Sequence, residues 1–194
     1  MTGRDGAAQE MGLTGGVPAA AAGDDEAALV ARARRGEAAA FEALYRRHRN
    51  QVYTLCLNLC GNPEDAQDML QETFVNACRG LPKFGGRSAF STWLYRIAVN
   101  VVRAAARRRR RDPEPAAAPS EPDAATVDHV RAVLGRLRPA HRTVLVLRYS
   151  QELSYREIAE CLQWSLSRVK VTLHRAKHAF KEAYLEAGAE EVAP

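Results

Sequence analysis

The sequence predicts an all-α fold: two small helical domains joined by a flexible linker, the C-terminal one a helix-turn-helix. Apolar residues recur at intervals of three and four along most of the chain, which is typical of helices that bury one face. No segment shows the alternation of apolar and polar residues that marks a half-buried strand. Residues 112–125 hold four prolines, four acidic residues and no large apolar residue, so they divide the helical pattern in two.

Composition narrows the classes of function before any motif is considered. The 194 residues carry a net charge of +5 at pH 7, which favours an anionic partner. No run of about 18 apolar residues is present, so we expect no membrane insertion. The N-terminus lacks a basic patch followed by an apolar core, and four cysteines in this length do not form a disulfide framework. We therefore expect a cytoplasmic protein with reduced thiols.

The first two helices are predicted after a tail, residues 1–23, whose Gly- and Ala-rich composition indicates disorder. Asp24 and Asp25 are positioned to cap a first helix, which we expect to end near Gly36. A second helix covers about 37–60. Its apolar residues define one buried face: Phe41, Leu44, Tyr45, His48, Val52, Leu55, Cys56 and Leu59.

Two more helices follow before the linker. Gly61 ends the second helix, and Asn62 is positioned to cap a third with Pro63 at its first position, where a missing N–H costs nothing. Residues 81–87 (LPKFGGR) combine a proline with a glycine pair and predict a loop. Ser88 is then expected to cap a fourth helix, which runs out into a stretch of arginines. The expected buried residues are Ala66, Met69, Leu70, Thr73, Phe74 and Ala77 in the third helix, and Phe90, Trp93, Leu94, Ile97, Ala98 and Val101 in the fourth.

The second domain begins with a helix near 126–136 and another after Pro139, with apolar residues available for burial. Ser154 and Glu157 have the spacing of a capping box and start a short helix. After a break near 164–165 a last helix follows. Two helices around a tight turn predict a helix-turn-helix. The buried stripe of the last helix is expected to comprise Leu166, Val169, Leu173, Ala176 and Phe180.

The third helix is acidic, and the region after it is the most basic part of the chain. Residues 62–78 contain four acidic side chains and no Lys or Arg, whereas residues 79–111 contain ten Lys or Arg and no Asp or Glu. Acidic residues in a first helical turn complement the helix dipole, but this does not explain Glu72, two turns further on. Asp65, Asp68 and Glu72 therefore suit a positively charged protein, and we expect them to be exposed and ion-paired only with that partner.

The fourth helix and the loop before it mix aromatic residues with cations. Aromatic rings that stack unpaired bases, beside cations that hold phosphates, are typical of proteins that bind single-stranded DNA. The alternative is that the rings form the core, and for Phe90 and Trp93 we prefer that interpretation. Phe84 lies in the Gly-rich loop, where burial is less secure. Asn100 carries an amide that suits the edge of a splayed base.

The outer face of the last helix is basic. A helix of this charge fits the major groove of DNA, where Arg and Lys read guanine and apolar groups meet thymine methyls. The alternative is a solvated basic helix, but its place as the second helix of a helix-turn-helix favours DNA reading. The residues on this face are Arg168, Lys170, Val171, Thr172, His174, Arg175, Lys177 and His178.

The histidine and cysteine pairs and the remaining motifs predict neither a metal site nor a catalytic site. His174 and His178 have the i, i+4 spacing of zinc ligands, but no Glu or Cys stands nearby to complete a site. Cys56 and Cys60 share that spacing and are expected to be buried as small hydrophobes. No phosphate-binding glycine loop, nucleophile elbow or metal cluster is evident. We expect no catalytic residue, no metal, no cofactor and no small-molecule substrate.

Three blocks of sequence carry a family resemblance: DAQDMLQETF, FGGRSAFSTWLYRIAVN and LSYREIAECL, the last followed by the basic helix. Over about 24–185 the chain resembles an extracytoplasmic-function (ECF) sigma factor of bacterial RNA polymerase. The resemblance implies a protein without catalysis of its own that recruits core polymerase, reads the minus-thirty-five promoter element as duplex, and opens and captures the minus-ten element. It implies sigma region 2 over 24–111, a linker over 112–125, sigma region 4 over 126–187 and a tail over 188–194. Such factors are commonly held inactive by an anti-sigma factor, which can keep them at the inner membrane.

The resemblance also implies roles for individual residues. The clamp helices of core polymerase would dock on Asp65, Asp68, Gln71 and Glu72. The minus-ten element would contact Phe84, Arg87, Ser88, Arg96, Asn100 and Arg103. The minus-thirty-five element would contact Arg168, Lys170, Val171, Thr172, His174, Arg175 and Lys177.

Several positions depart from the family pattern. The turn into the last helix often has Pro and then Gly-Thr, where this chain has Ser165 and Ser167-Arg168. Val171 stands where the family often has a small polar residue, and Thr172 stands where it often has an arginine. The promoter sequence that this chain recognises therefore cannot be inferred from that of its relatives. The arginine stretch before the linker, Arg107–Arg111, is longer than is usual in the family. A stand-alone helix-turn-helix regulator is the alternative function, and the acidic stripe and two-domain layout argue against it.

Overall fold

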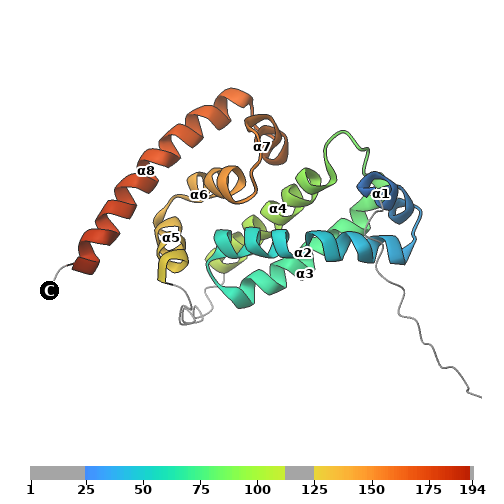
Figure 1. The fold of residues 1–194 in the computed structure, drawn as a ribbon, viewed down its shortest axis with the longest axis horizontal. Helices are drawn as coiled ribbons and strands as arrows, with labels where there is room; N and C mark the ends of the chain where they lie inside the picture. The colour runs from blue at the N-terminus through green and yellow to red at the C-terminus, as the bar shows by residue number, and fades with distance from the viewer. Residues whose placement is uncertain (1–24, 112–124, 193–194) are drawn as a thin grey trace, which may run out of the picture.

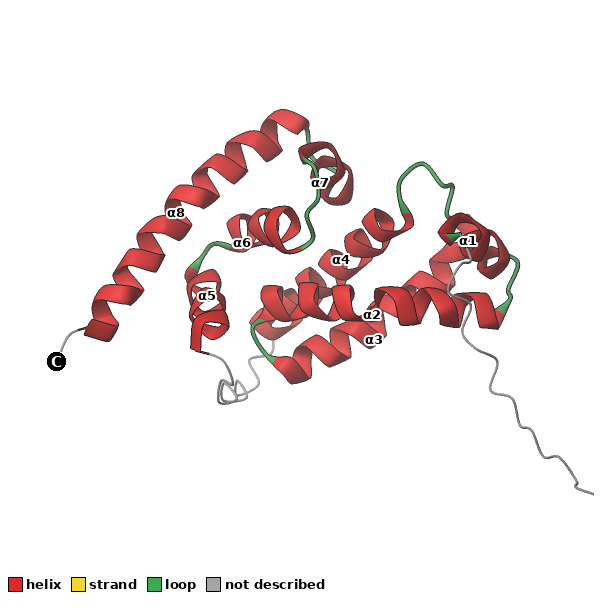
Figure 2. Cartoon of the chain, in the orientation of Figure 1, coloured by secondary structure: helices red, strands yellow, loops and turns green. Residues whose placement is uncertain are grey.

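The computed structural model describes residues 25–111 and 125–192 (Figure 1). Within these ranges all regular structure is helical and no strand occurs (Figure 2), which confirms the predicted fold class. The predicted disordered tail, residues 1–23, lies outside the described residues. So do 112–124 of the predicted linker and the last two residues of the C-terminal tail.

The N-terminal unit is a bundle of α2, α3 and α4, with α1 packed against α2 (Figure 1). A short 3-10 turn, η1 (Leu81–Lys83), leads from α3 into the loop before α4. All the residues predicted for the buried face of α3 are buried, as are most of those predicted for α2. Phe41 and Tyr45 are only half-buried, and both rings pack edge-on against Phe74. The helix bounds are α1 (Glu26–Arg34), α2 (Ala38–Cys60), α3 (Pro63–Gly80) and α4 (Phe90–Arg111).

Local capping sets most of these boundaries as predicted. Asp25 accepts a hydrogen bond from the Ala27 N–H at the start of α1, and Asn62 accepts one from the Asp65 N–H at the start of α3. Gly61 ends α2 in the left-handed conformation, at φ 79°. The predicted Ser88 cap is wrong. The Ala89 carbonyl accepts the first bond of α4, from the Trp93 N–H, which leaves Ser88 in the loop.

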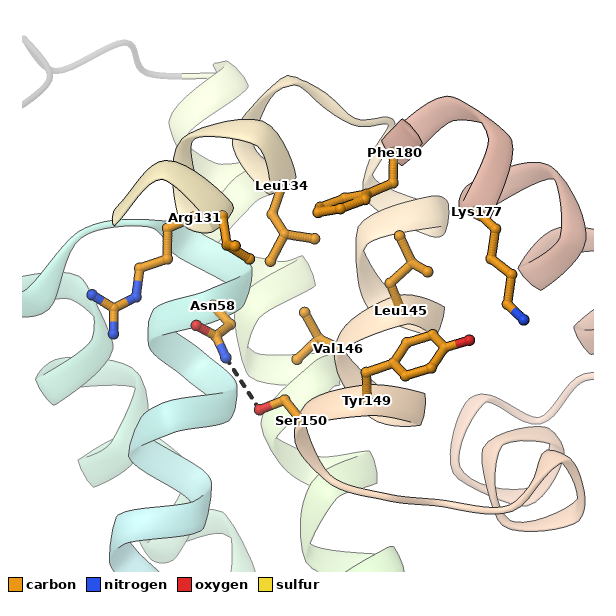
Figure 3. A pocket seen from close by; sticks show the side chains of 10 residues that line it. Asn58, Arg131, Leu134, Leu145, Val146, Tyr149, Ser150, Lys177 and Phe180 are labelled. Carbon is orange, nitrogen blue, oxygen red and sulfur yellow. Dashed lines mark hydrogen bonds between the residues drawn. The ribbon is translucent and has the colours of Figure 1, made fainter. Parts of the chain in front are cut away.

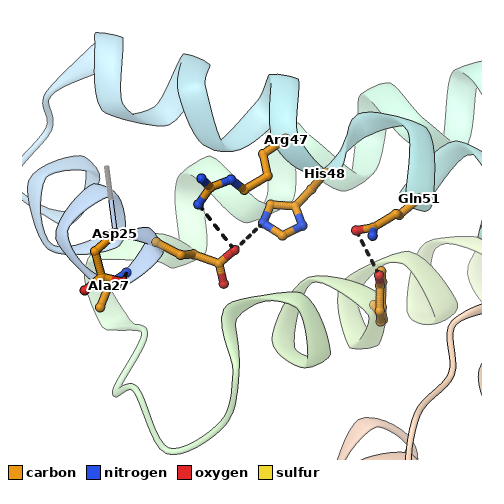
Figure 4. Close-up of polar contacts among 7 residues, drawn as sticks. Asp25, Ala27, Arg47, His48 and Gln51 are labelled. Atoms are coloured by element: carbon orange, nitrogen blue, oxygen red, sulfur yellow. Dashed lines mark hydrogen bonds and ion pairs between the residues drawn. The ribbon is translucent and has the colours of Figure 1, made fainter. Parts of the chain in front are cut away.

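Polar contacts tie α1 and α4 to α2 (Figure 4). Nε2 of the buried His48 lies 2.9 Å from a carboxylate oxygen of Glu26, and the Arg47 guanidinium approaches the same oxygen to 4.0 Å. The Tyr95 hydroxyl donates to the Gln51 side-chain oxygen at 3.2 Å, and burial raises the pKa of Tyr95 to about 12. The Tyr95 hydrogen bond ties α2 to α4, which carries several of the predicted minus-ten residues.

The C-terminal unit contains the predicted helix-turn-helix as α7 and α8. The capping box is confirmed: the Ser154 N–H donates to the Glu157 carboxylate at 2.8 Å, and the Glu157 N–H donates to Ser154 Oγ at 3.2 Å. The buried stripe of α8 differs from the prediction at its ends, because Leu166, at the first helical position, is exposed and Phe180 is half-buried. The elements are α5 (Ala125–Arg136), α6 (Pro139–Leu145), a π-helical turn η2 (Val146–Ser150), α7 (Tyr155–Leu162) and α8 (Leu166–Val192), which extends beyond the predicted domain end at 187.

The two units also contact each other, which the sequence did not predict. α2 packs against α5, α6 and η2, and α4 packs against α7. Arg142 of α6 donates to three carbonyls at this junction: Leu59 in the last turn of α2 at 2.7 Å, and Leu134 and Gly135 near the end of α5 at 2.7 and 2.6 Å. Carbonyls at helix ends lack intrahelical partners and carry partial negative charge. One half-buried guanidinium thus joins two helix ends from different units.

Replacing Arg142 by methionine is expected to lower the free energy of unfolding by about 2 kcal/mol or more, because hydrogen bonds to a charged group are worth roughly 1.5–3 kcal/mol. The α2–α6 contact should loosen at the same time. Urea denaturation and small-angle scattering measure the two effects. Arg156→Met, which removes an exposed arginine from α7, is the matched control. Equal stability and equal radius of gyration for the two variants would show that Arg142 does not hold the units together.

Candidate functional site

The four predicted polymerase-docking residues lie on α3. The buried face of α3 packs into the bundle, so the other side of the helix faces solvent. Asp65, Asp68 and Glu72 follow one another along that side, because residues three and four apart share a helical face, and together they form the acidic stripe. Gln71 is exposed beside them.

The prediction that the acidic stripe is ion-paired only with a partner is wrong for two of its members. Arg108 at the end of α4 places Nη2 3.1 Å from Glu72 Oε2. Arg109 forms an ion pair with Asp65, whose side chain is only 19% exposed. The cause is tertiary: α3 and α4 pack side by side, so the basic end of one helix meets the acidic face of the other. Asp68 is exposed and forms no ion pair with a side chain that the structure describes.

Phe84 is a core residue in this structure, so its ring is largely buried and not freely exposed for the minus-ten contact that the resemblance implies. Its ring lies 4.9 Å from that of Trp93 and 6.0 Å from that of Phe90, between centroids, and the residue is 7% exposed. The Phe84 N–H donates to the Leu81 carbonyl, so η1 turns the chain back over the bundle. The preferred interpretation of Phe90 and Trp93 as core is confirmed.

The remaining loop residues surround a polar hollow at the start of α4. Arg87, Ser88 and Arg96 line this cavity of about 320 Å³. The other lining residues are Lys83, Phe84, Gly85, Trp93 and, from α7, Glu160. Three cations therefore converge on one small space. Asn100, further along α4, is exposed, as a residue that meets a partner must be.

Arg103 does not lie on a free surface. It is half-buried, and burial lowers the pKa of Arg103 from its ordinary value. The buried Cys161 thiol of α7 lies near it: burial raises the pKa of Cys161 to about 12, while the charges of Arg103 and Arg96 act in the opposite direction. The packing of α7 against α4 thus covers a predicted minus-ten residue.

The predicted minus-thirty-five residues lie on α8, and all are exposed except the half-buried Thr172. Val171 is 50% exposed, which leaves an apolar side chain among cations. The Arg168 guanidinium lies over the Trp164 ring, 4.0 Å from its centroid, and this cation–π contact orients it. Lys177 lies on the flank of the helix, where the hydrogen bond with the Tyr149 hydroxyl raises the pKa of Lys177.

Sequence reasoning missed an apolar pocket of about 600 Å³ in the C-terminal unit, with Asn58 of α2 at its edge. Figure 3 shows Leu134 of α5, Leu145 of α6, Tyr149 of η2 and Phe180 of α8 around it. The Asn58 side chain of α2 donates to Ser150 Oγ at 3.2 Å on its edge. Because several elements distant in sequence build the pocket, no local pattern signals it.

The described residues contain no group of three or more His, Cys, Asp or Glu suited to holding a metal ion. The His174 and His178 rings lie 4.7 Å apart between centroids on the exposed side of α8. Cys56 is buried as predicted, which raises the pKa of its thiol to about 12, and Cys60 is half-buried. Among the helices that the structure describes, none is long and apolar enough to cross a membrane.

Comparison with known proteins places both units in one family. The family model for Sigma-70 region 2 matches residues 44–112, and that for Sigma-70 region 4 matches residues 128–179. The ECF RNA polymerase sigma-E factor of Haemophilus influenzae is 32% identical over 171 residues, covering 77% of this chain and 90% of that protein. The chain belongs to the ECF family of RNA polymerase sigma factors.

Other relatives agree with this assignment. The RNA polymerase sigma factor YlaC of Bacillus subtilis is 36% identical to this sigma factor over 164 residues, covering 77% of this chain and 95% of YlaC. Among solved structures, CnrH in complex with the cytosolic domain of CnrY is similar with a TM-score of 0.64 and 30% identity, over 82% of this chain and 96% of that one. The sigma factor RpoE of Bartonella quintana, in complex with the anti-sigma factor NepR, shares the fold at a TM-score of 0.64 and 19% identity, over 74% of this chain and 95% of that one.

Proposed function

We propose that this sigma factor recruits core RNA polymerase through the acidic stripe of α3 and opens and captures the minus-ten element with the start of α4. Helix α8 then reads the minus-thirty-five element as duplex DNA. The observation that carries the proposal is the separation of acidic and basic surfaces within the N-terminal unit. The acidic stripe offers carboxylates to a basic protein, and Lys83, Arg87 and Arg96 surround a hollow that suits phosphates and a splayed base. We assign the protein no catalytic activity.

Access to the minus-ten surface requires a change in the packing of the two units. Glu160 of α7 lines the cationic hollow, and α7 also covers Arg103. A carboxylate beside the hollow would repel DNA phosphates, and an arginine half-buried against α7 is less free to contact them. We therefore expect α7 to move away from α4 when promoter DNA binds.

Run-off transcription tests the proposed function directly. Purified core polymerase, with and without this protein, would transcribe a library of random promoters. We expect transcripts that depend on the protein and that start a fixed distance downstream of two conserved elements. A stand-alone helix-turn-helix regulator would instead select DNA without supporting any transcription by core polymerase.

Specificity for the minus-thirty-five element is expected to depend on Arg175. Its exposed guanidinium can bind guanine with two hydrogen bonds, a contact worth about 1–3 kcal/mol of discrimination. Arg175→Ala should therefore relax preference at one or two positions. Lys177→Ala, on the flank of α8, should weaken binding to all sequences alike and lower the salt slope by about one. Selection of binding sites by both full-length variants measures this. An unchanged sequence logo for Arg175→Ala would make Arg175 a phosphate contact.

We also propose that an anti-sigma factor holds this protein inactive in the cytoplasm or at the inner membrane. The support is that two proteins with this fold form such complexes: the sigma factor RpoE with the anti-sigma factor NepR, and CnrH, 30% identical to this chain, with the cytosolic domain of CnrY. Co-purification of this chain from its own host would identify such a partner. Recovery of core polymerase alone would contradict this part of the proposal.

A further inference from the structure

The arginine stretch at the end of α4 lies along the acidic stripe of α3. Arg108 pairs with Glu72 at 3.1 Å, and Arg109 pairs with Asp65. We propose that this basic helix end is an internal competitor, which occupies the acidic stripe and lowers the affinity of the free sigma factor for core polymerase. The inference rests on the proposed function, because it takes the acidic stripe to be the polymerase-docking surface.

The geometry of the two pairs favours competition over a merely structural role. Asp65 and Glu72 lie two helical turns apart, at the two ends of the stripe, whereas Arg108 and Arg109 are neighbours. The two guanidinium groups therefore diverge along α3 and engage both ends of the stripe, with Asp68 between them. A basic partner that approached the stripe would meet two carboxylates already neutralised.

The strength of the contact suits a competitor that can be displaced. The arginine side chains are 66% and 58% exposed, so water and salt screen both pairs. Exposed ion pairs of this kind are weak, each contributing little to stability. A partner that presents several cations at once, over a surface from which water is excluded, can therefore displace Arg108 and Arg109 from the acidic stripe. The arginine stretch would then be released to face solvent or the phosphates of promoter DNA.

Substitution of the two paired arginines tests the competition. Titration of the full-length chain into core polymerase without DNA measures affinity free of phosphate contacts. We expect Arg108→Gln/Arg109→Gln to bind core polymerase roughly three- to tenfold more tightly than the unaltered chain, the size expected from one or two exposed ion pairs. The matched control is Arg107→Gln/Arg111→Gln, which removes the same charge from the same helix end but leaves both pairs intact. Unchanged or weaker binding of the first variant, or an equal gain in the control, overturns the proposal.

Two further variants separate this inference from the function on which it rests. Asp68→Lys alters the docking surface without removing either pair. If Asp68→Lys leaves the affinity for core polymerase unchanged, the docking assignment fails and the competitor with it. If Asp68→Lys weakens binding but Arg108→Gln/Arg109→Gln does not tighten it, the competition alone fails. In an Asp65→Asn/Glu72→Gln background the arginine substitutions should change nothing, because coupled residues are not additive; a persisting gain would contradict the mechanism.

Discussion

Replacing Phe84 by alanine is expected to lower the free energy of unfolding of the N-terminal unit by about 3–5 kcal/mol, the usual cost of removing a buried phenylalanine. The physical reason is the aromatic cluster at the start of α4, where Phe84 packs against Trp93 and Phe90. The loss of the ring would leave a cavity beside Trp93. Urea denaturation followed by far-ultraviolet circular dichroism measures the change.

Two comparisons make this result decisive. Val75→Ala truncates an apolar residue that is 48% exposed on α3, and we expect it to cost little. Phe84→Leu retains most of the buried volume, so promoter opening should be largely preserved. If Phe84 instead stacks on melted bases, Phe84→Leu would abolish permanganate reactivity in the minus-ten region while leaving stability nearly unchanged.

Reversing the charge of Asp68 is expected to weaken binding to core polymerase by roughly tenfold or more, because close interfacial charge pairs couple by about 1.5–7 kcal/mol. Asp68 is the sharpest probe of the acidic stripe: it is exposed, and none of the arginine side chains that the structure describes forms an ion pair with it. Asp68→Lys should therefore leave helicity and stability intact. Competition binding to purified core polymerase, with a labelled unaltered chain as the reference, measures the loss.

Glu182→Lys provides the matched control, since it makes the same change of net charge on the exposed side of α8. Its affinity for core polymerase in the absence of DNA should stay close to that of the unaltered chain. If both variants bind as tightly as the unaltered chain, the polymerase does not dock on the acidic stripe. If both lose affinity equally, net charge rather than the stripe governs binding.

Local chemistry made most of the fold predictable. Asn62 with Pro63, and Ser154 with Glu157, satisfy helix-end N–H groups through neighbours in the sequence, so their structural effect can be recognised from spacing alone. The buried face of α3 follows from its helical period in the same way. The prediction failed by one residue at the start of α4, where Ala89 rather than Ser88 supplies the first carbonyl of the helix.

The sequence predicted which residues form the charged helical faces. It did not predict which of those residues are exposed and which are buried or already ion-paired. The sequence identifies acidic and basic helical faces, because charge and period are local properties. It gave no sign that Phe84 turns inward, because that depends on rings from α4 meeting the loop. Nor did it indicate that Arg103 is covered by α7, or that Arg108 and Arg109 reach the acidic stripe.

By itself, the sequence determined an all-helical chain in two units, the family to which it belongs, and which helices carry charge. Only the tertiary structure decided which of those charges are available to a partner. The reason is physical: helix formation and capping depend on residues within about four positions of each other, whereas exposure and ion pairing depend on which helices pack together. In this sigma factor the packing of α4 against α3 and α7 pairs two carboxylates of the acidic stripe and covers Arg103, while Asp68 and Asn100 remain exposed.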